Sequence, residues 1–245
     1  MVSDKTYLIM WPLVLLYYLY GTQILPKVSR MVVRRVPWTT KHPFLDVEQS
    51  ILFTLAALSQ FGFCILMIAI SDARLGQLGF NTFRPMLFLF GLVLGLGEMG
   101  LASLLCYFAM ETVRSLAPAR VPSRKEDWLA LLNAGWMRQI NRMVNTAPGT
   151  VSGGAIILYI AGEEIIFRSI LVNAALPLGP VAAVATSTLF FSLIQTLRMP
   201  SWRSGIFPVI GALVMGTIHG TLFVQVPEIW PLIGAHLILF VVGAL

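Results

Sequence analysis

The chain alternates between long apolar runs and short polar connections. A helix needs about 20 apolar residues to cross a hydrocarbon core about 30 Å thick. Runs of about this length recur along the whole chain, so the pattern predicts an all-α polytopic membrane protein with about seven transmembrane helices. The predicted spans are residues 7–25, 49–70, 85–110, 151–175, 179–197, 205–225 and 229–245.

The first run is expected to remain in the protein as a span. It follows Asp4 and Lys5, and no small-residue cleavage site stands at its end. Composition agrees with a membrane protein, because 57% of the residues are hydrophobic and 11% are charged. Soluble domains have about 45–50% apolar and about 25% charged residues. Both cysteines, Cys64 and Cys106, lie in apolar runs, which favours small buried side chains over a disulfide.

The basic residues predict the orientation of the chain, because Lys and Arg accumulate in cytoplasmic loops. Seven spans place thirteen basic residues in the connections on one side and three on the other. The N-terminus is therefore expected outside and the C-terminus in the cytoplasm, in a cell (inner) membrane. The net charge of +6 follows from this topology and from anionic lipid. The expected partner is the lipid bilayer, and no nucleic-acid motif is visible.

Ionisable residues inside spans cost about 2.5–3.5 kcal/mol each on insertion scales, so they are candidate functional residues. Glu164 precedes Arg168 by four residues, which places the two side chains one helical turn apart. Glu163 points about 100° away from Glu164 and is expected to be the unpaired carboxylate. Such a carboxylate can accept a proton from water as a general base. The alternative is that all three residues form a buried polar clasp between helices. The intramembrane ionisable residues are Glu98, Glu163, Glu164, Arg168, His219 and His236.

Three motifs in the C-terminal part occur in a fixed order. The first is E-E-x-x-x-R at residues 163–168, and it is complete. The second, F-x-x-x-H, begins at Phe191 but ends in Gln195. The third, H-x-x-x-N, begins at His236 but ends in Phe240. In this order the motifs resemble those of the CPBP family, which contains CAAX proteases and bacteriocin-processing membrane proteins.

The resemblance covers roughly residues 75–245 and implies a CPBP-like helical core there. Residues 1–74 would then form an N-terminal part with its own spans and a basic cytoplasmic loop. In the family, the first glutamate and the second-motif histidine are thought to activate a water. By position, Glu163 would be the base and Gln195 would stand in the place of its partner. His236 and Phe240 would occupy the oxyanion positions, while Glu164 and Arg168 would hold the helix geometry.

The two substitutions threaten catalysis for physical reasons. A glutamine amide can orient water, but it cannot exchange a proton near neutral pH as imidazole does. Phenylalanine offers no hydrogen-bond donor to an oxyanion, and losing one such donor costs about 10²–10³-fold in rate.

Three further residues have open roles. His219 could replace the missing imidazole, or it could be a packing residue hydrogen-bonded to a neighbouring helix. His236 is a site residue by its motif position, and otherwise a satisfied core histidine. Glu98 could be a protonated packing residue, a cavity-lining group or a partner for Arg168.

Other chemistries have little support in the sequence. No H-E-x-x-H motif is present to hold zinc, and no glycine-rich phosphate loop indicates a nucleotide, so we expect no metal and no cofactor. Three functions stay open. The first is a catalytically impaired subunit or scaffold that binds a partner membrane segment or a lipidated peptide. The second is an active intramembrane endopeptidase that uses Glu163, and the weakest is a small proton-coupled transporter.

Overall fold

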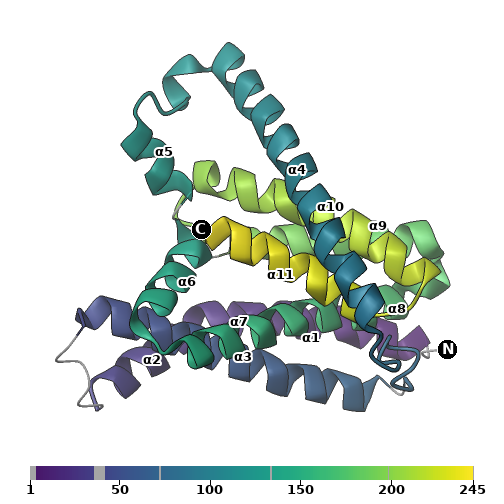
Figure 1. Ribbon diagram of the computed structural model, residues 1–245. Helices are drawn as coiled ribbons and strands as arrows, with labels where there is room; N and C mark the ends of the chain where they lie inside the picture. The colour runs from purple at the N-terminus through teal and green to yellow at the C-terminus, as the bar shows by residue number, and fades with distance from the viewer. Residues whose placement is uncertain (1–3, 36–41, 72, 133, 198, 245) are drawn as a thin grey trace.

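The protein is helical throughout the part that the computed structural model describes, which is residues 4–35, 42–71, 73–132, 134–197 and 199–244. Figure 1 shows the arrangement of its helices. In chain order the elements are α1 (Asp4–Gln23), α2 (Leu25–Val33), α3 (Phe44–Ile70), α4 (Pro85–Leu116), η2 (Pro118–Arg120), α5 (Lys125–Leu132), α6 (Gly135–Thr146), α7 (Gly149–Glu164), η3 (Ile165–Val172), α8 (Asn173–Ala175), η4 (Leu176–Leu178), α9 (Pro180–Thr196), α10 (Trp202–Gln225) and α11 (Trp230–Ala244).

Within the described residues, all seven predicted runs lie on helices apart from a few residues at helix ends, and residue 245 of the last run lies outside the described part. The fourth run is a continuous helical rod made of α7, η3 and α8. Among the described residues, α3, α4 and α10 are long and apolar enough to cross a membrane, while α9 and residues Trp230–Val242 are shorter apolar helices. The all-helical class is therefore confirmed for the described residues. The number of seven crossings stays a prediction.

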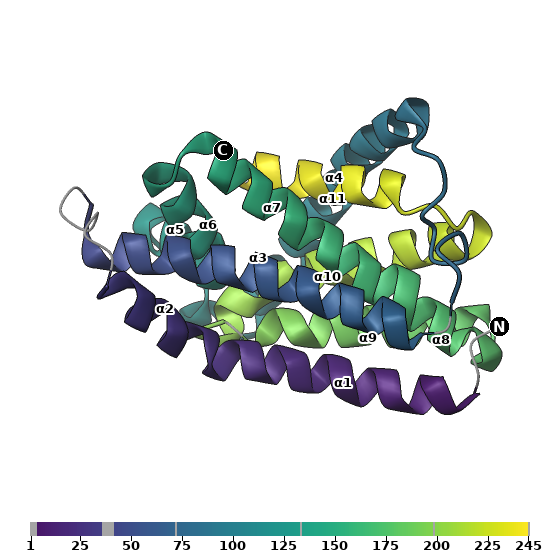
Figure 2. The ribbon, with the colours of Figure 1, turned by 90° about the horizontal axis from the view of Figure 1, so that it is seen from below.

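The rod of α7 and η3 lies at the centre of the packing. Helix α3 packs along α7, while η3 contacts α1, α3, α9 and α10. Figure 2 shows α1, α3 and α7 running beside one another along the length of the molecule. Every residue of η3 is buried, and Ile166 and Phe167 have no exposed surface at all. Helix α1 thus shares a core with the C-terminal half, while the predicted boundary near residue 74 stays a prediction.

The segment η3 is a π-helix, in which the helical turn is wider than in an α-helix. Side-chain hydroxyls from the segment and its surroundings hold it in place. Ser187 of α9 donates a hydrogen bond to the carbonyl oxygen of Phe167 at 2.6 Å. Ser169 donates to the carbonyl oxygen of Leu78 at 2.6 Å. Segments of this kind occur often at functional sites.

Helices α4 and α11 approach so closely that their backbones touch. A Cβ atom added at Gly91 would collide with the backbone of Pro231, and one added at Gly95 would collide with the backbone of Ala235. Small residues permit this approach in membrane proteins, where association depends on close packing. The G-x-x-x-G pattern therefore fixes α4 against α11 and brings Glu98, one turn further along α4, to the interior.

Connections that are distant in sequence meet at one end of the molecule. The backbone N–H of Ile229 donates to the carbonyl oxygen of Gly79, and Asn173 donates to that of Gln77. An ion pair between Arg84 and Glu228 joins the same two chain segments, 71–84 and 226–229. Gly79 has a φ of 81°, a conformation that favours glycine, and a Cβ there would lie 2.8 Å from a ring carbon of Phe223.

Basic residues of α2 and α6 form ion pairs at the opposite end. Arg30 pairs with Glu48 at 2.8 Å, and Arg142 pairs with Asp46 at 3.2 Å. Figure 1 shows α2, α5 and α6 at this end, with the N-terminus at the other. The connections that the sequence assigns to opposite sides of the membrane are thus separated in the structure. The direction in which each end faces stays a prediction.

Candidate functional site

Glu163 and Glu164 end helix α7 and point in different directions, as expected for successive residues of a helix. Both side chains are buried, with 3% of Glu163 and none of Glu164 exposed. Glu164 faces α10 and α11, and one histidine from each of these helices contacts its carboxylate. Glu163 faces a small cavity that α1, α6 and α9 also line. One dipeptide therefore serves two neighbouring sites.

Glu164 is the centre of an ion cluster. Its Oε1 lies 2.7 Å from Nδ1 of His236, and its Oε2 lies 2.9 Å from Nδ1 of His219. Arg168 places its Nε 3.3 Å from Oε2, one helical turn further along the chain. The predicted pairing of Glu164 with Arg168 is confirmed. The two histidines that join it come from different helices, which spacing along a single helix does not reveal.

His219 connects this cluster to helix α4. Its second ring nitrogen, Nε2, lies 3.1 Å from Oε2 of Glu98. The hydrogen bond to a neighbouring helix that the packing interpretation of His219 expects is present, with partners on two helices, while its role in place of the missing imidazole stays a prediction. The contact that the structure gives Glu98 is with His219 rather than with Arg168, the partner that the sequence suggested, and its other two roles stay predictions.

The prediction that Glu163 is unpaired is wrong. His236 lies between the two glutamates, with Nδ1 toward Glu164 and Nε2 3.6 Å from Oε2 of Glu163. The reason is the path of α11, which packs against α7 and brings one imidazole within reach of both carboxylates. His236 is therefore both a member of its motif and a satisfied core histidine.

The charges of the cluster can balance completely. Glu98, Glu163 and Glu164 supply three carboxylates, and Arg168 supplies one fixed positive charge. The cluster is neutral when both imidazoles carry two protons, a state in which each ring nitrogen can donate to the carboxylate oxygen that it faces. A balanced cluster is what burial requires, because an isolated charge in a medium of low polarity is very costly.

Arg168 has contacts of two kinds. Its guanidinium carbon lies 4.4 Å from the ring centre of Phe191, which is a cation–π distance. Its Nε faces Glu164, while Nη1 and Nη2 have no hydrogen-bond partner among the described residues. Phe191 is the first residue of the second motif, so the two motifs meet directly through this stacking.

Gln195 lies on the other side of Glu163. Both residues line a cavity of about 20 Å³. That volume is sufficient for one water molecule, which needs about 10–15 Å³. Tyr18 of α1 and Trp136 of α6 also line this cavity, and neither the Tyr18 hydroxyl nor the Trp136 Nε1 has a hydrogen-bond partner among the described residues. Neither residue can be recognised as a site residue from the sequence, because both lie outside the three motifs.

Phe240 fills the remaining motif position with an aromatic ring. The ring centre lies 5.2 Å from that of His236 and 5.0 Å from that of Trp136, on which it stacks at 23°. The side chain is 5% exposed. The position thus presents ring carbon to His236 and offers no N–H or O–H group.

Residues 148–242 match a family model described as type II CAAX prenyl endopeptidase Rce1-like. The matched segment contains all three motifs and His219, whereas Glu98, Tyr18 and Trp136 lie before it. No curated protein matches the chain, and no solved structure matches it. The order of the motifs and this match agree, and the match of residues 148–242 to an Rce1-like model is consistent with the CPBP family.

Proposed function

We propose that this protein is a catalytically impaired member of the CPBP family that acts as a membrane subunit or scaffold. Its role is to bind a partner membrane segment or a lipidated peptide. The observation that carries the proposal is the position of Phe240, packed between His236 and Trp136. A tetrahedral intermediate of peptide hydrolysis carries a negative oxygen that requires a hydrogen-bond donor. Phe240 has none to offer.

The surroundings of Glu163 support the same proposal. Hydrolysis needs a proton to be taken from water and a proton to be delivered to the leaving amine, and a second proton carrier beside the base assists both steps. Gln195, which shares the cavity with Glu163, cannot carry that proton. His236 is held between two carboxylates by contacts of 2.7 and 3.6 Å, so its ring is committed to the ion cluster.

Cleavage of a farnesylated peptide ending in a CAAX sequence tests the proposal, with the released tripeptide measured by mass spectrometry. We expect wild type to cleave no faster than Glu163→Gln. We expect the double variant Gln195→His with Phe240→Asn to gain cleavage, because it restores both missing groups. A triple variant that adds Glu163→Gln is the control and should lose that gain.

Wild-type cleavage that depends on Glu163 would overturn the proposal and establish the second candidate function, an intramembrane endopeptidase. The water-sized cavity between Glu163 and Gln195 favours this candidate. There Glu163 would accept a proton from water as the water oxygen attacks the peptide carbonyl carbon. Collapse of the intermediate would then break the C–N bond, with the proton passing to the amine.

A further inference from the structure

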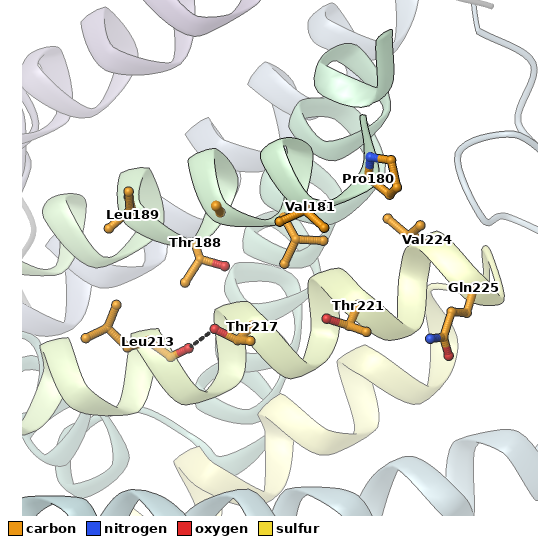
Figure 3. A pocket seen from close by; sticks show the side chains of 11 residues that line it. Pro180, Val181, Thr188, Leu189, Leu213, Thr217, Thr221, Val224 and Gln225 are labelled. Atoms are coloured by element: carbon orange, nitrogen blue, oxygen red, sulfur yellow. Dashed lines mark hydrogen bonds between the residues drawn. The ribbon is translucent and has the colours of Figure 1, made fainter. Parts of the chain in front are cut away.

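A groove of about 520 Å³ lies between α9 and α10, on the surface of the Rce1-like segment. Figure 3 shows its two walls, with Val181 and Leu189 on α9 and Leu213 and Val224 on α10. The groove is lined almost entirely by apolar and small side chains. It shares no lining residue with the cavity at Glu163.

The floor of the groove is formed where the two helices touch. A Cβ added at Gly216 would lie 2.7 Å from Cγ2 of Thr188, and one added at Gly220 would lie 3.0 Å from Cγ1 of Val184. Ala185 lines the groove beside this contact and is exposed. The close approach of the helices keeps the floor narrow, because the side chains of Thr188 and Val184 pack directly on the two glycines.

Among the side chains that line the groove, Thr188 carries a buried hydroxyl that its own helix does not satisfy, whereas Thr221 and Gln225 are exposed. Thr188 is 5% exposed, and its Oγ1 has no hydrogen-bond partner among the described residues. Other hydroxyls on these helices donate to a carbonyl one turn back, such as Thr186 to Ala182 at 2.7 Å and Thr217 to Leu213 at 2.8 Å. Figure 3 shows the Thr188 side chain pointing into the space between the two helices.

The position of Thr188 along α9 favours a helix over a lipid chain as the partner of its hydroxyl. Thr188 is the ninth of the 17 residues of α9, about 12 Å from either end at 1.5 Å per residue. If α9 crosses the membrane, this hydroxyl lies near the midplane. The polar groups of a phospholipid lie at the boundary of the hydrocarbon core, about 15 Å from the midplane. A polar side chain at the centre of a transmembrane helix can reach Thr188.

We propose that the groove between α9 and α10 binds one transmembrane helix of another protein. That helix carries a ridge of small residues and a serine, threonine or asparagine at its centre, which hydrogen-bonds to Thr188. Close packing of small residues and hydrogen bonds between helices are the two forces that associate helices in a bilayer. The proposal rests on the proposed scaffold function and gives the partner segment a binding surface.

Two synthetic helices test the proposal in phosphatidylcholine vesicles that contain the full-length protein. Both are 20-residue leucine-rich peptides with alanines at i and i+4, and one carries a central serine where the other carries alanine. Binding is measured by energy transfer from the peptide to a fluorophore on the protein. We expect wild type to bind the serine peptide roughly 3-fold to 20-fold more tightly, the range for one hydrogen bond between membrane helices.

Three variants distinguish the effect of the Thr188 hydroxyl on binding from the effect of the shape of the groove. Thr188→Val keeps the side-chain shape and should remove the preference for serine. Thr186→Val is the matched control and should keep it, because the Thr186 hydroxyl is bonded within its own helix. Ala185→Phe fills the groove and should weaken binding of both peptides. Unfolding temperatures establish that each variant is folded.

A preference for serine that survives Thr188→Val, or binding unchanged by Ala185→Phe, would overturn the proposal. Equal binding of the two peptides by wild type would overturn the hydrogen bond to Thr188, and failure of both to bind would overturn the proposal and assign the groove to lipid chains. Self-association that Ala185→Phe removes would overturn it in favour of a second copy of this chain. Peptide cleavage by wild type is a separate measurement. Cleavage would overturn the proposed scaffold function, whereas the binding results above decide whether the groove holds a helix.

Discussion

Arg168 and Glu164 form an ion pair that is completely inside the molecule, with side-chain exposures of 1% and 0%. Three side chains of the cluster can carry a positive charge, namely Arg168 and the two histidines. Arg168 is always charged, whereas each histidine is charged only when its imidazole carries two protons. Its guanidinium stacks on Phe191, so its side chain joins the first motif to the second. The stability of the site therefore depends on this residue more than on any single histidine.

Replacing Arg168 by glutamine should destabilise the protein strongly. Removal of one partner of a buried ion pair costs about 3–5 kcal/mol, because the other charge stays buried without compensation. The matched control is Arg114→Gln on α4, whose partner Glu111 is partly exposed and whose own side chain is 55% exposed. An exposed pair contributes about 0–1 kcal/mol. The measurement is thermal unfolding in mild detergent, and equal losses in the two variants would contradict this account.

For individual residues, the sequence was sufficient to predict contacts between side chains of the same helix. The spacing of four residues was sufficient for the Glu164–Arg168 pair. It was not sufficient for His236, which contacts Glu163 and Glu164 from a helix that begins 66 residues after Glu164. Contacts of that kind depend on how helices pack, and one sequence does not contain that information.

Helix α4 is anchored to α11 through two glycines, while other glycines on the same helix are free of contacts. Gly91 and Gly95 face the backbone of α11, and Gly97 and Gly100 have nothing within 4 Å of where a Cβ would stand. The four residues therefore separate the effect of packing from the effect of helix propensity within a single element.

Gly95→Ala should lower stability by about 1–3 kcal/mol, because the added methyl group forces two backbones apart. Gly97→Ala should be neutral or stabilising, since alanine favours a helix over glycine by about 1 kcal/mol. The unfolding temperatures of both variants in the same detergent give the comparison. A loss at Gly97 equal to that at Gly95 would mean that contact with α11 is not the cause.

The predicted runs and the observed helices agree because hydrophobicity along the chain is a local property. The departure of η3 from α-helical geometry was not predicted. Its Ile, Phe, Arg and Ser residues suit an ordinary buried helix as well. The structure shows that hydrogen bonds from Ser187 and Ser169 join this segment to neighbouring parts of the chain, and such bonds become visible only in three dimensions.

The whole molecule has a connection-rich end around Gly79 and Ile229 and a basic end around α2, α5 and α6 (Figure 1). The basic end is expected in the cytoplasm, where anionic lipid attracts Lys and Arg. The native cysteines Cys64 and Cys106 are buried, so an introduced cysteine can be labelled selectively.

The orientation can be measured with Thr82→Cys and Ser123→Cys, two exposed positions at opposite ends. A maleimide reagent that does not cross membranes should label Thr82→Cys in intact cells. It should label Ser123→Cys only after the cells are permeabilised. The reverse pattern would mean an inverted chain, and labelling of both in intact cells would contradict the predicted number of crossings.

The π-helical segment makes one part of the buried helix tolerant of a change in chain length. A stretch of this kind holds an extra residue in its wide turn, so removal of one apolar residue from Ile165–Val172 would allow an ordinary α-helix to form. Because the wide turn takes up that residue locally, the helices on either side of it would keep nearly the same rotation, and both glutamates would still face the histidines. An ordinary α-helix cannot absorb such a change. Loss of one residue from α7 would rotate the part of α7 before it by about 100° relative to Glu163 and Glu164.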